Sequence, residues 1–409
     1  MNEVVSTHCC IAGGGPAGMM LGFLLARMGV EVMVLEKHAD FLRDFRGDTV
    51  HPSTLDVLHE LGLLGEFLER PHQELREIAG QVGAETVSFA DLQHMPTHCK
   101  FIALMPQWDF LDFLKQHAGR YPGFRLVMQA EVTDLIEEKG AVAGVRAKTP
   151  SGTLEVHARL VVGADGRRSV VRERGGLSVE DLGAPMDVMW MKISRRPDDR
   201  GQTFGHFDRG CILVLINRET YWQAAFVIPK GEADRVRERG IEAFREEIGQ
   251  LEPFLGGRLQ ELRDWNDVSL LTVKVDRLRE WSRPGLLCIG DAAHAMSPIG
   301  GVGINLAIQD AVATANILGA PLLRGTPSAS ELEAVQGRRN FPTRATQSLQ
   351  IAVQNRIIKR VLGRTEQFSL PWQLKLVRRL PILRRIPARV IGVGFRPEHV
   401  RTPEIARPS

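Results

Sequence analysis

The sequence contains few cysteines, and their positions exclude the usual cysteine-based sites. The five cysteines, at positions 9, 10, 99, 211 and 288, form no C-x-x-C pair and leave an odd count. This pattern indicates neither a disulfide framework nor a zinc site, and it is typical of a protein in a reducing cytoplasm. We therefore predict no metal cofactor and a cytoplasmic location.

Long apolar runs and a large excess of charge are also missing. No run approaches the roughly twenty apolar residues that a bilayer-spanning helix needs, and no secretory signal precedes the first predicted strand. The net charge of +3 over 409 residues is close to balance and gives no sign of a nucleic-acid partner. A hydrophobic content of 44% and a charged content of 25% are ordinary for a soluble globular protein.

The clearest pattern present is a strand, turn and helix near the N-terminus. An apolar run at residues 9–12 leads into Gly13-x-Gly15-x-x-Gly18, and a helix-length stretch and a second strand follow, ending on Glu36. Gly13 permits the tight turn, Gly15 lets the backbone approach a pyrophosphate, and Gly18 lets the helix pack against the sheet. Glu36 is placed to accept hydrogen bonds from ribose hydroxyls. The unit predicts a dinucleotide site for either NAD or FAD, with an ordinary glycine turn as the alternative.

Three polar residues lie where residue chemistry alone leaves their role open. Arg46 is on a loop that runs near the dinucleotide turn, and Gln107 is at the entrance of a predicted helix. Asp165 is on a turn between a strand and a short helix, where an aspartate can cap the helix and can also contact a ligand. Each of the three has a structural interpretation and a binding one.

A second glycine-rich stretch lies far along the chain. A buried strand at residues 286–289 ends on Gly290-Asp291, and the glycine loop, residues 298–303, opens a long helix. An aspartate at a strand end can bind a ribitol or ribose hydroxyl, and the N–H groups of the loop and helix favour partial negative charge. His294 lies between the two; a structural role is favoured over a catalytic one, so we assign it none.

In this order, the three stretches resemble the class A flavoprotein monooxygenases, the para-hydroxybenzoate hydroxylase-like family of FAD-dependent aromatic hydroxylases. Residues 164–172 are similar to the family's Asp-Gly motif, and residues 290–303 are similar to its Gly-Asp motif. Arg46 matches the family's arginine near the FAD diphosphate, and Gln107 matches the glutamine that holds the ribityl chain. The FAD-binding residues that the resemblance implies are Gly13, Gly15, Pro16, Ala17, Gly18, Glu36, Lys37, Arg46, Gln107, Asp165, Gly290, Asp291, Pro298, Gly300, Gly301, Val302 and Gly303.

The resemblance implies an FAD-dependent, NAD(P)H-consuming monooxygenase. Such an enzyme uses O2 to hydroxylate an aromatic, quinone-like or polyketide-like small molecule through a flavin C4a-hydroperoxide. No second Gly-x-Gly-x-x-Gly lies between a strand and a helix, so NAD(P)H is expected to dock transiently. The cofactor carries the chemistry, and we identify no catalytic acid or base. Two alternatives remain: a flavin oxidoreductase of the same fold that reduces or epoxidises an isoprenoid or other lipophilic substrate, and a non-catalytic flavin-binding or drug-binding protein.

The order of the segments predicts an α/β fold in which a Rossmann-like FAD-binding domain is interrupted by a β-sheet substrate domain. A chain of 409 residues is long enough for two such domains. The predicted FAD-binding domain comprises residues 1–72, 105–178 and 278–345, and the predicted substrate domain comprises residues 73–104 and 179–277.

The remaining residues, 346–409, are predicted to form a basic helical C-terminal segment. It interleaves Leu, Ile and Trp with many Arg and Lys. The favoured interpretation is a set of helices that cover the FAD-binding domain, with arginine stems lying along apolar surface. The alternative is a peripheral contact with an anionic membrane at its inner face, which would admit a lipophilic substrate.

Overall fold

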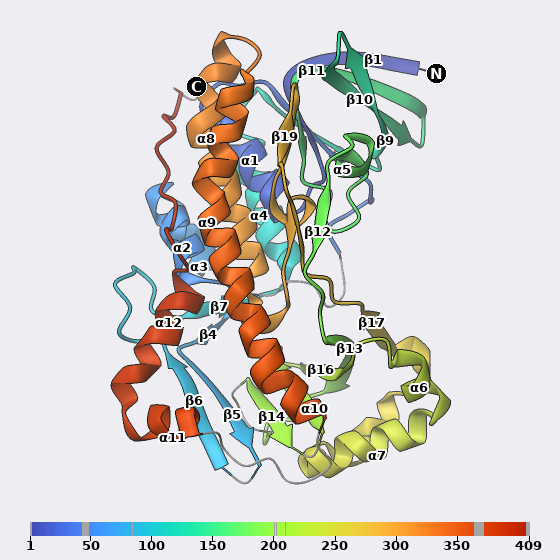
Figure 1. Cartoon of the computed structure of the whole chain (residues 1–409), viewed down its shortest axis with the longest axis vertical. Coiled ribbons are helices and arrows are strands. Elements are labelled where there is room, and N and C mark those ends of the chain that lie inside the picture. Colours follow the sequence, from blue (N-terminus) through green and yellow to red (C-terminus); the bar gives the residue numbers. More distant parts are fainter. Residues whose placement is uncertain are drawn as a thin grey trace.

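Two large β-sheets form the body of the protein, and a long helix, α9 (Ala329–Val353), runs from one to the other (Figure 1). The computed structural model describes residues 2–42, 49–83, 85–199, 201, 203–208, 210–363 and 372–405. Sheets and helices are mixed along the chain, which confirms the predicted α/β class.

The first sheet is built around β1 (Asn2–Ala12), which pairs in parallel with β11 on one side and β2 on the other. Strand β2 (Val32–Glu36) is buried at every position, as expected for a parallel strand covered on both faces. The strand order is β19-β20-β11-β1-β2-β8, and β10 and β9 extend the sheet from β11. The other strands are β8 (Phe124–Met128), β9 (Glu131–Glu138), β10 (Ala141–Thr149), β11 (Gly152–Gly163), β19 (Ser282–Arg283) and β20 (Leu286–Cys288).

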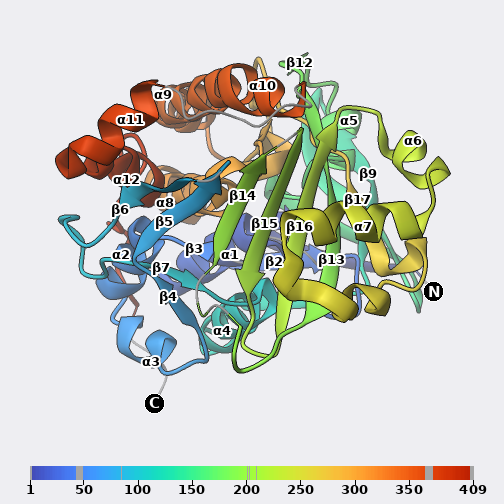
Figure 2. The same cartoon turned by 90° about the horizontal axis from the view of Figure 1, so that it is seen from below.

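The second sheet has the order β17-β13-β16-β15-β14-β5-β6 and two different faces. Side chains alternate along β13, so Met189 and Met191 pack in the apolar cluster under helix α7, while Val188 and Trp190 point to the other face. Figure 2 shows α7 lying across the first of these faces. The strands are β5 (Glu77–Val82), β6 (Glu85–Asp91), β13 (Met186–Ser194), β14 (Phe204–Asp208), β15 (Cys211–Asn217), β16 (Tyr221–Pro229) and β17 (Val268–Leu271).

Two small three-stranded sheets are formed by strands interspersed among those of the large ones. Strands β3 (Thr49–Val50), β7 (Ile102–Leu104) and β4 (Gln73–Leu75) form one. Strands β12 (Val179–Asp181), β18 (Asp276–Leu278) and β21 (His294–Ala295) form the other. The strands of residues 73–104 are therefore divided between two sheets, and the domain boundaries drawn from the sequence stay a prediction.

The helices of the first part of the structure pack around α1 (Pro16–Arg27), whose residues 17–26 are all buried. Helix α1 contacts α4 (Gln107–Ala118) and α8 (Gly303–Arg324). The other α-helices are α2 (Pro52–Glu60), α3 (Leu64–Leu68), α5 (Val170–Arg174), α6 (Ala233–Glu238), α7 (Ile241–Leu251), α10 (Lys359–Leu362), α11 (Trp372–Arg379) and α12 (Arg385–Gly392). Short 3-10 and π turns are η1 (Pro253–Glu261), η2 (Trp265–Asp267), η3 (Gly290–Ala292), η4 (Ile299–Gly301), η5 (Gln354–Ile358) and η6 (Pro381–Arg384).

One helical stretch in the described part of the chain, Ile299–Arg324, is long and apolar enough to cross a membrane by length and composition. The expectation that no such stretch exists was therefore wrong. However, 78% of its most apolar window is buried inside the protein. A core helix of this kind satisfies the same test because it is surrounded by apolar protein atoms instead of lipid.

The helices near the C-terminus lie only in part where predicted. Helix α10 packs against β15 and β16, and α11 and α12 pack against β6 (Figure 1). Helices α10 and α11 therefore cover the second sheet. Helix α12 also contacts the predicted FAD-binding part, because the carbonyl of Ile391 lies 2.8 Å from Nδ1 of His51, next to α2. The prediction that the C-terminal helices cover the FAD-binding part is therefore correct only in part. The C-terminal strap, residues 396–405, also reaches that part: the Arg27 guanidinium donates to the carbonyl of Thr402 at 2.8 Å.

Candidate functional site

The glycine turn brings two of the predicted motifs into contact. Gly13 has a φ of +104°, and a Cβ there would lie 2.4 Å from the carbonyl oxygen of Ala164, next to Asp165. A Cβ on Gly18 would lie 1.9 Å from the carbonyl oxygen of Gly13. These two glycines are therefore required by the fold itself. Gly15 is different, because a Cβ there meets no atom within 4 Å.

Glu36 closes the turn from the end of β2. One oxygen of its buried carboxylate accepts a hydrogen bond from the backbone N–H of Gly14 at 2.9 Å, and the other accepts one from the N–H of His38 at 3.0 Å. Pro16 is the first residue of α1, where its missing N–H costs nothing. The neighbouring Lys37 is exposed. Glu36 therefore fixes the backbone of the glycine turn as well as presenting a negative charge there.

Asp165 and Asp291 lie at the ends of neighbouring parallel strands, β11 and β20. Asp165 accepts a hydrogen bond from the N–H of Val171 at 3.2 Å, so the predicted capping role is real, although Ser169 is the N-cap of α5. Burial raises the pKa of Asp165 above its ordinary value, although hydrogen bonds from Ser169 and nearby backbone groups offset part of the effect. Arg167 donates from Nε to the Asp291 carboxylate at 3.0 Å, which joins the second and third motifs.

The glycine loop is held from the side of strand β3. Gly300 and Gly301 have φ values of +77° and +64°, which other residues rarely adopt. The hydroxyl of Thr49 donates to the carbonyl of Gly301 at 3.0 Å. Val302 precedes α8, and Gly303 is its first residue, so the positive end of this long helix points at the loop.

Gly290 places the strand end against the first helix. A Cβ on Gly290 would lie 3.2 Å from the Cβ of Ala17 in α1 and 3.2 Å from that of Ala307 in α8. Gln107 is the first residue of α4, which also packs against α1. The structure thus gathers the three motifs around the N-terminus of α1. Arg46 lies outside the described residues.

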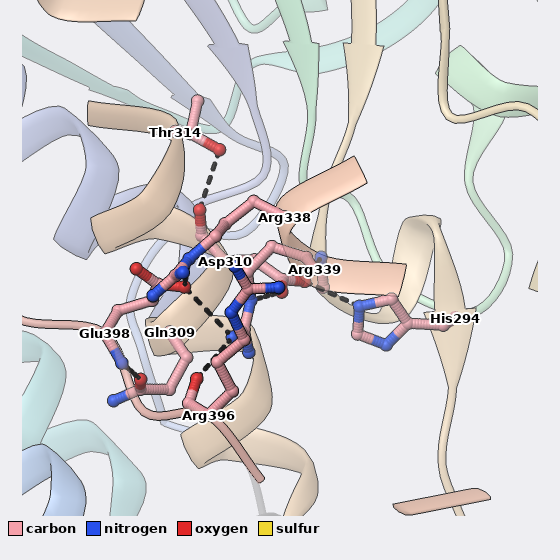
Figure 3. A network of polar contacts seen from close by, with 9 residues as sticks. His294, Gln309, Asp310, Thr314, Arg338, Arg339, Arg396 and Glu398 are labelled. Carbon is pink, nitrogen blue, oxygen red and sulfur yellow. Dashed lines mark hydrogen bonds and ion pairs between the residues drawn. The ribbon is translucent and has the colours of Figure 1, made fainter. Parts of the chain in front are cut away.

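His294 belongs to a buried polar network and not to an open site (Figure 3). Its Nε2 lies 2.6 Å from Oδ2 of Asp310, and Nε of Arg339 donates to Oδ1 of Asp310 at 2.9 Å. Arg339 in turn lies 3.4 Å from the carboxylate of Glu398 in the C-terminal strap. These contacts support the structural interpretation of His294.

Several residues around the site were missed from the sequence. Asn305 accepts hydrogen bonds from the N–H of His51 at 3.2 Å and from the hydroxyl of Thr54 at 2.7 Å, which ties α8 to α2. Asp310 lies on the same helix and accepts from the N–H of Gly290 at 3.1 Å. The available signal was the presence of polar residues on an otherwise apolar, buried helix.

Two buried polar atoms beside the glycine turn fit a dinucleotide with hydroxyl and phosphate groups. In the part of the chain that the structure describes, Oδ1 of Asp165 and Nη1 of Arg167 are buried without a hydrogen-bond partner. Buried polar atoms in proteins are almost always satisfied, so these two indicate a ligand or ordered water. The open space at Gly15 offers room for a pyrophosphate. The same described residues contain no group of three His, Cys, Asp or Glu side chains placed to hold a metal.

Comparisons with known proteins agree with this geometry. The family model described as an FAD binding domain matches residues 6–348. A 6-methylpretetramide 4-monooxygenase from Streptomyces rimosus is 33% identical over 94% of this chain and 92% of its own length. An aklavinone 12-hydroxylase from Streptomyces peucetius is 27% identical over 84% of this chain and 73% of its own length.

A solved structure gives the same fold. The p-nitrophenol 4-monooxygenase of Pseudomonas putida DLL-E4 superposes with a TM-score of 0.77, covering 94% of this chain and 97% of that one. The sequence identity is 19%, so this likeness concerns the fold alone.

Proposed function

The chain belongs to the FAD-binding family of class A flavoprotein monooxygenases, and from this membership we propose that it hydroxylates a fused-ring aromatic polyketide. It is an FAD-dependent monooxygenase, an oxidoreductase that uses O2, and NAD(P)H is the electron donor typical of the family. The relatives give no support to an isoprenoid reductase or epoxidase, or to a non-catalytic drug-binding protein.

We propose that the three motifs hold FAD along the path that the strand ends define. Gly13, Gly15, Gly18 and Glu36 would hold the ADP half, and Asp165 and Asp291 would face the middle of the molecule. Pro298, Gly300, Gly301, Val302 and Gly303 would lie against the flavin ring, with Pro16, Ala17, Lys37, Arg46, Gln107 and Gly290 completing the site. When bound, FAD supplies the activation of O2, for which the twenty side chains have no equivalent.

The proposed substrate class rests on the apolar face of the second sheet. Val188, Ile212, Val227 and the partly buried Trp190 belong to one apolar cluster on this face. Ile299 of the glycine loop packs against the same cluster. The sheet face and the loop proposed to contact the flavin therefore meet in one apolar cluster, in which Trp190 and Ile299 are only partly buried. An apolar lining of this kind suits a large, flat, uncharged ring system.

The C-terminal helices add to the same surface. Ile358 and Val361, from η5 and α10, are buried in the cluster that contains Trp190 and Ile299. An aromatic ring bound there would be covered by aliphatic side chains from three segments. Exclusion of water around the reacting ring favours hydroxylation over unproductive consumption of NAD(P)H.

The test compares a fused-ring substrate with a small phenol. We expect the FAD-loaded protein to incorporate one atom of ¹⁸O₂ into 6-methylpretetramide, with NAD(P)H consumption matched by product. Para-nitrophenol should give mainly uncoupled NAD(P)H oxidation, because it leaves much of the apolar surface uncovered. Efficient coupling with para-nitrophenol and none with 6-methylpretetramide would contradict the proposed substrate class.

A pair of tryptophan variants tests the proposed surface. Trp190→Leu should raise KM for the fused-ring substrate by roughly tenfold, since loss of aromatic stacking and contact area costs about 1 to 2 kcal/mol. Trp265→Leu is the matched control, because Trp265 packs in the cluster on the opposite face of the same sheet. Equal effects of the two substitutions on KM would argue against binding at this face.

A second proposal concerns the surface of α11 and α12. Residues 375–389 contain six Arg and Lys and no Asp or Glu. Four large aliphatic side chains are exposed in this stretch: Leu376, Leu380, Ile382 and Ile386. Exposed aliphatic side chains among arginines are typical of proteins that rest on anionic membranes. We propose a peripheral contact at the inner face of the membrane for a protein that otherwise lies in the cytoplasm.

Vesicle sedimentation tests this contact. The protein should bind vesicles of equal phosphatidylglycerol and phosphatidylcholine, bind phosphatidylcholine alone much less, and dissociate in high salt. Ile382→Ser combined with Ile386→Ser should reduce binding, whereas Leu323→Ser, an exposed leucine at the far end of α8, should not. Vesicle binding unchanged by the isoleucine variant, or a dimer that this variant dissociates without any vesicle binding, would contradict the proposal.

A further inference from the structure

Helix α9 and the turn that follows it carry three buried glutamines on one side. Gln347, Gln350 and Gln354 are at most 4% exposed, and their spacing of three and four residues places them along one face. Glutamine is rarely buried, and when buried its amide must be hydrogen-bonded. All three amides bind the segment that runs from β21 into the glycine loop.

Gln350 makes the largest number of these contacts. Its Nε2 donates to the carbonyl oxygens of Ser297 at 3.0 Å and Ile299 at 2.9 Å, and its Oε1 accepts from the N–H of Ser297 at 3.2 Å. Gln354 donates to the hydroxyl of Ser297 at 2.7 Å. Side-chain amides thus take the place of a neighbouring strand for the residues that lead into the loop.

These contacts set the direction of the peptide groups in the loop. In a trans peptide, the C=O and the following N–H point in opposite directions. Because Gln350 draws the carbonyl of Ile299 toward α9, the N–H of Gly300 points away from α9. The two glycines that follow have little conformational preference of their own, so the orientation of the loop has to be imposed by its neighbours.

We propose that Gln350 is a positioning residue for the flavin, acting through the peptide groups of the glycine loop. This inference rests on the proposed function, in which the loop lies against the flavin ring. The oriented N–H of Gly300 presents partial positive charge, which binds the reduced, more negative flavin more tightly than the oxidised one, whereas the N–H of Gly301 donates to the carbonyl of Pro298 within the loop. Gln354 supports the same segment through Ser297.

Gln347 provides the matched control. It lies one helical turn before Gln350 and is fully buried, and its Nε2 donates to the carbonyl oxygens of Asp276 at 2.8 Å and Ala295 at 3.1 Å. It therefore loses comparable hydrogen bonds when substituted, but its partners precede the loop. A purely structural role for the glutamines predicts the same consequences at both positions.

The experiment measures the two-electron midpoint potential and the visible absorption spectrum of bound FAD in Gln350→Met and Gln347→Met, together with their melting temperatures. In Gln350→Met, binding of reduced relative to oxidised flavin should weaken about tenfold, a fall of about 30 mV in the potential. The flavin absorption bands should shift as well. In Gln347→Met, the melting temperature should fall while the potential and spectrum stay as in the wild type.

A folded Gln350→Met with wild-type potential and spectrum, or equal shifts in both variants, would overturn the inference. If Gln350→Met fails to fold, Gln350→Asn replaces it, because its amide is one methylene too short to reach both carbonyl oxygens. Wild-type protein that binds no FAD would instead contradict the proposed function, before any variant is compared.

Discussion

The carboxylate of Asp310 and the imidazole of His294 form a hydrogen bond of 2.6 Å in a fully buried site. The same oxygen of Asp310 accepts from the N–H of Gly290, the residue before Asp291. Asp310 thus holds both ends of the short turn between the strand end and His294. This relationship explains why a histidine so near the glycine loop serves the fold.

Asp310→Asn should destabilise the protein by about 3 kcal/mol or more, because it leaves the buried guanidinium of Arg339 without its nearest carboxylate. Urea denaturation at pH 7, with saturating FAD for variant and wild type, measures this loss. A free energy of unfolding within 1 kcal/mol of the wild type would contradict the assignment.

The pH dependence of the same variant gives an independent check. Burial by itself raises the pKa of Asp310, but the interactions with His294 and Arg339 outweigh it and hold the pKa below 3.8. A carboxyl group with a lowered folded-state pKa stabilises above its unfolded pKa, and this contribution is lost as the pH falls through the folded value. Wild-type stability should therefore fall below pH 3.8 more steeply than that of Asp310→Asn.

His51 should make the stability of the protein depend on pH in a different range. Burial lowers its pKa to about 4 from 6.5, and the hydrogen bond of Nδ1 with the carbonyl of Ile391, at 2.8 Å, offsets only part of this. Between these values the unfolded chain takes up a proton that the folded chain does not, so stability falls as the pH drops from 6.5 to about 4. The total loss is about 3 kcal/mol.

His51→Asn should remove this component. The asparagine amide can donate to the carbonyl of Ile391, and asparagine suits the N-cap position that His51 occupies before α2. Urea midpoints of variant and wild type, both saturated with FAD, should converge as the pH is lowered from 7 to 4.5. Parallel curves over this range would show that His51 does not titrate as described.

The residues that could be predicted are those whose chemistry is local. Gly18 and Glu36 contact the glycine turn from within the same unit of β1, α1 and β2, so their spacing predicts the turn. Gln350 and Asp310 could not be assigned in this way, because their partners lie on other elements: Ser297 is 53 residues from Gln350, and Arg339 is 29 residues from Asp310.

The C-terminal helices illustrate the same limit. Alternation of apolar and basic residues predicts that one face of α12 packs against the rest of the chain. It does not predict which part of the chain forms that contact. Ala388 of α12 packs with Met95 and Leu104, from the segment around β6 and β7, whereas Ile391 on the same helix contacts His51 at the start of α2. The choice of surface depends on the three-dimensional path of the chain, which the pattern of a single helix does not contain.

The C-terminal strap should contribute to stability through Glu398. Its buried carboxylate pairs with Nε of Arg338 at 2.6 Å and Nη1 of Arg339 at 3.4 Å. Glu398→Gln removes the charge that both arginines share and should cost about 3 kcal/mol in urea denaturation. His399→Ala is the control, because His399 lies on the same strap and its imidazole, which pairs with Glu60 of α2, is 64% exposed. This exposed pair should contribute less than about 1 kcal/mol. Similar losses in the two variants would mean that burial does not strengthen the Glu398 pair.

Substitution by alanine should affect the stability of the FAD-free protein at Gly18 but not at Gly15. At Gly18 the new Cβ would lie 1.9 Å from the carbonyl oxygen of Gly13, so Gly18→Ala should destabilise the protein even without FAD, by about 1 to 3 kcal/mol. At Gly15 the new Cβ meets no protein atom within 4 Å, and the φ of −75° suits any residue. Gly15→Ala should leave the melting temperature of the FAD-free protein nearly unchanged.

Gly15→Ala should instead weaken FAD binding, because the space at Gly15 is where we propose that the pyrophosphate approaches the backbone. Titration of flavin fluorescence should show at least tenfold weaker binding to Gly15→Ala, equivalent to about 1.4 kcal/mol. Gly65→Ala is the matched control: its Cβ also meets nothing within 4 Å, but Gly65 lies in α3, outside the proposed site, and FAD affinity should stay at the wild-type value. Wild-type affinity in Gly15→Ala would mean that this open space is not the pyrophosphate site, since a methyl group there must displace whatever the backbone contacts.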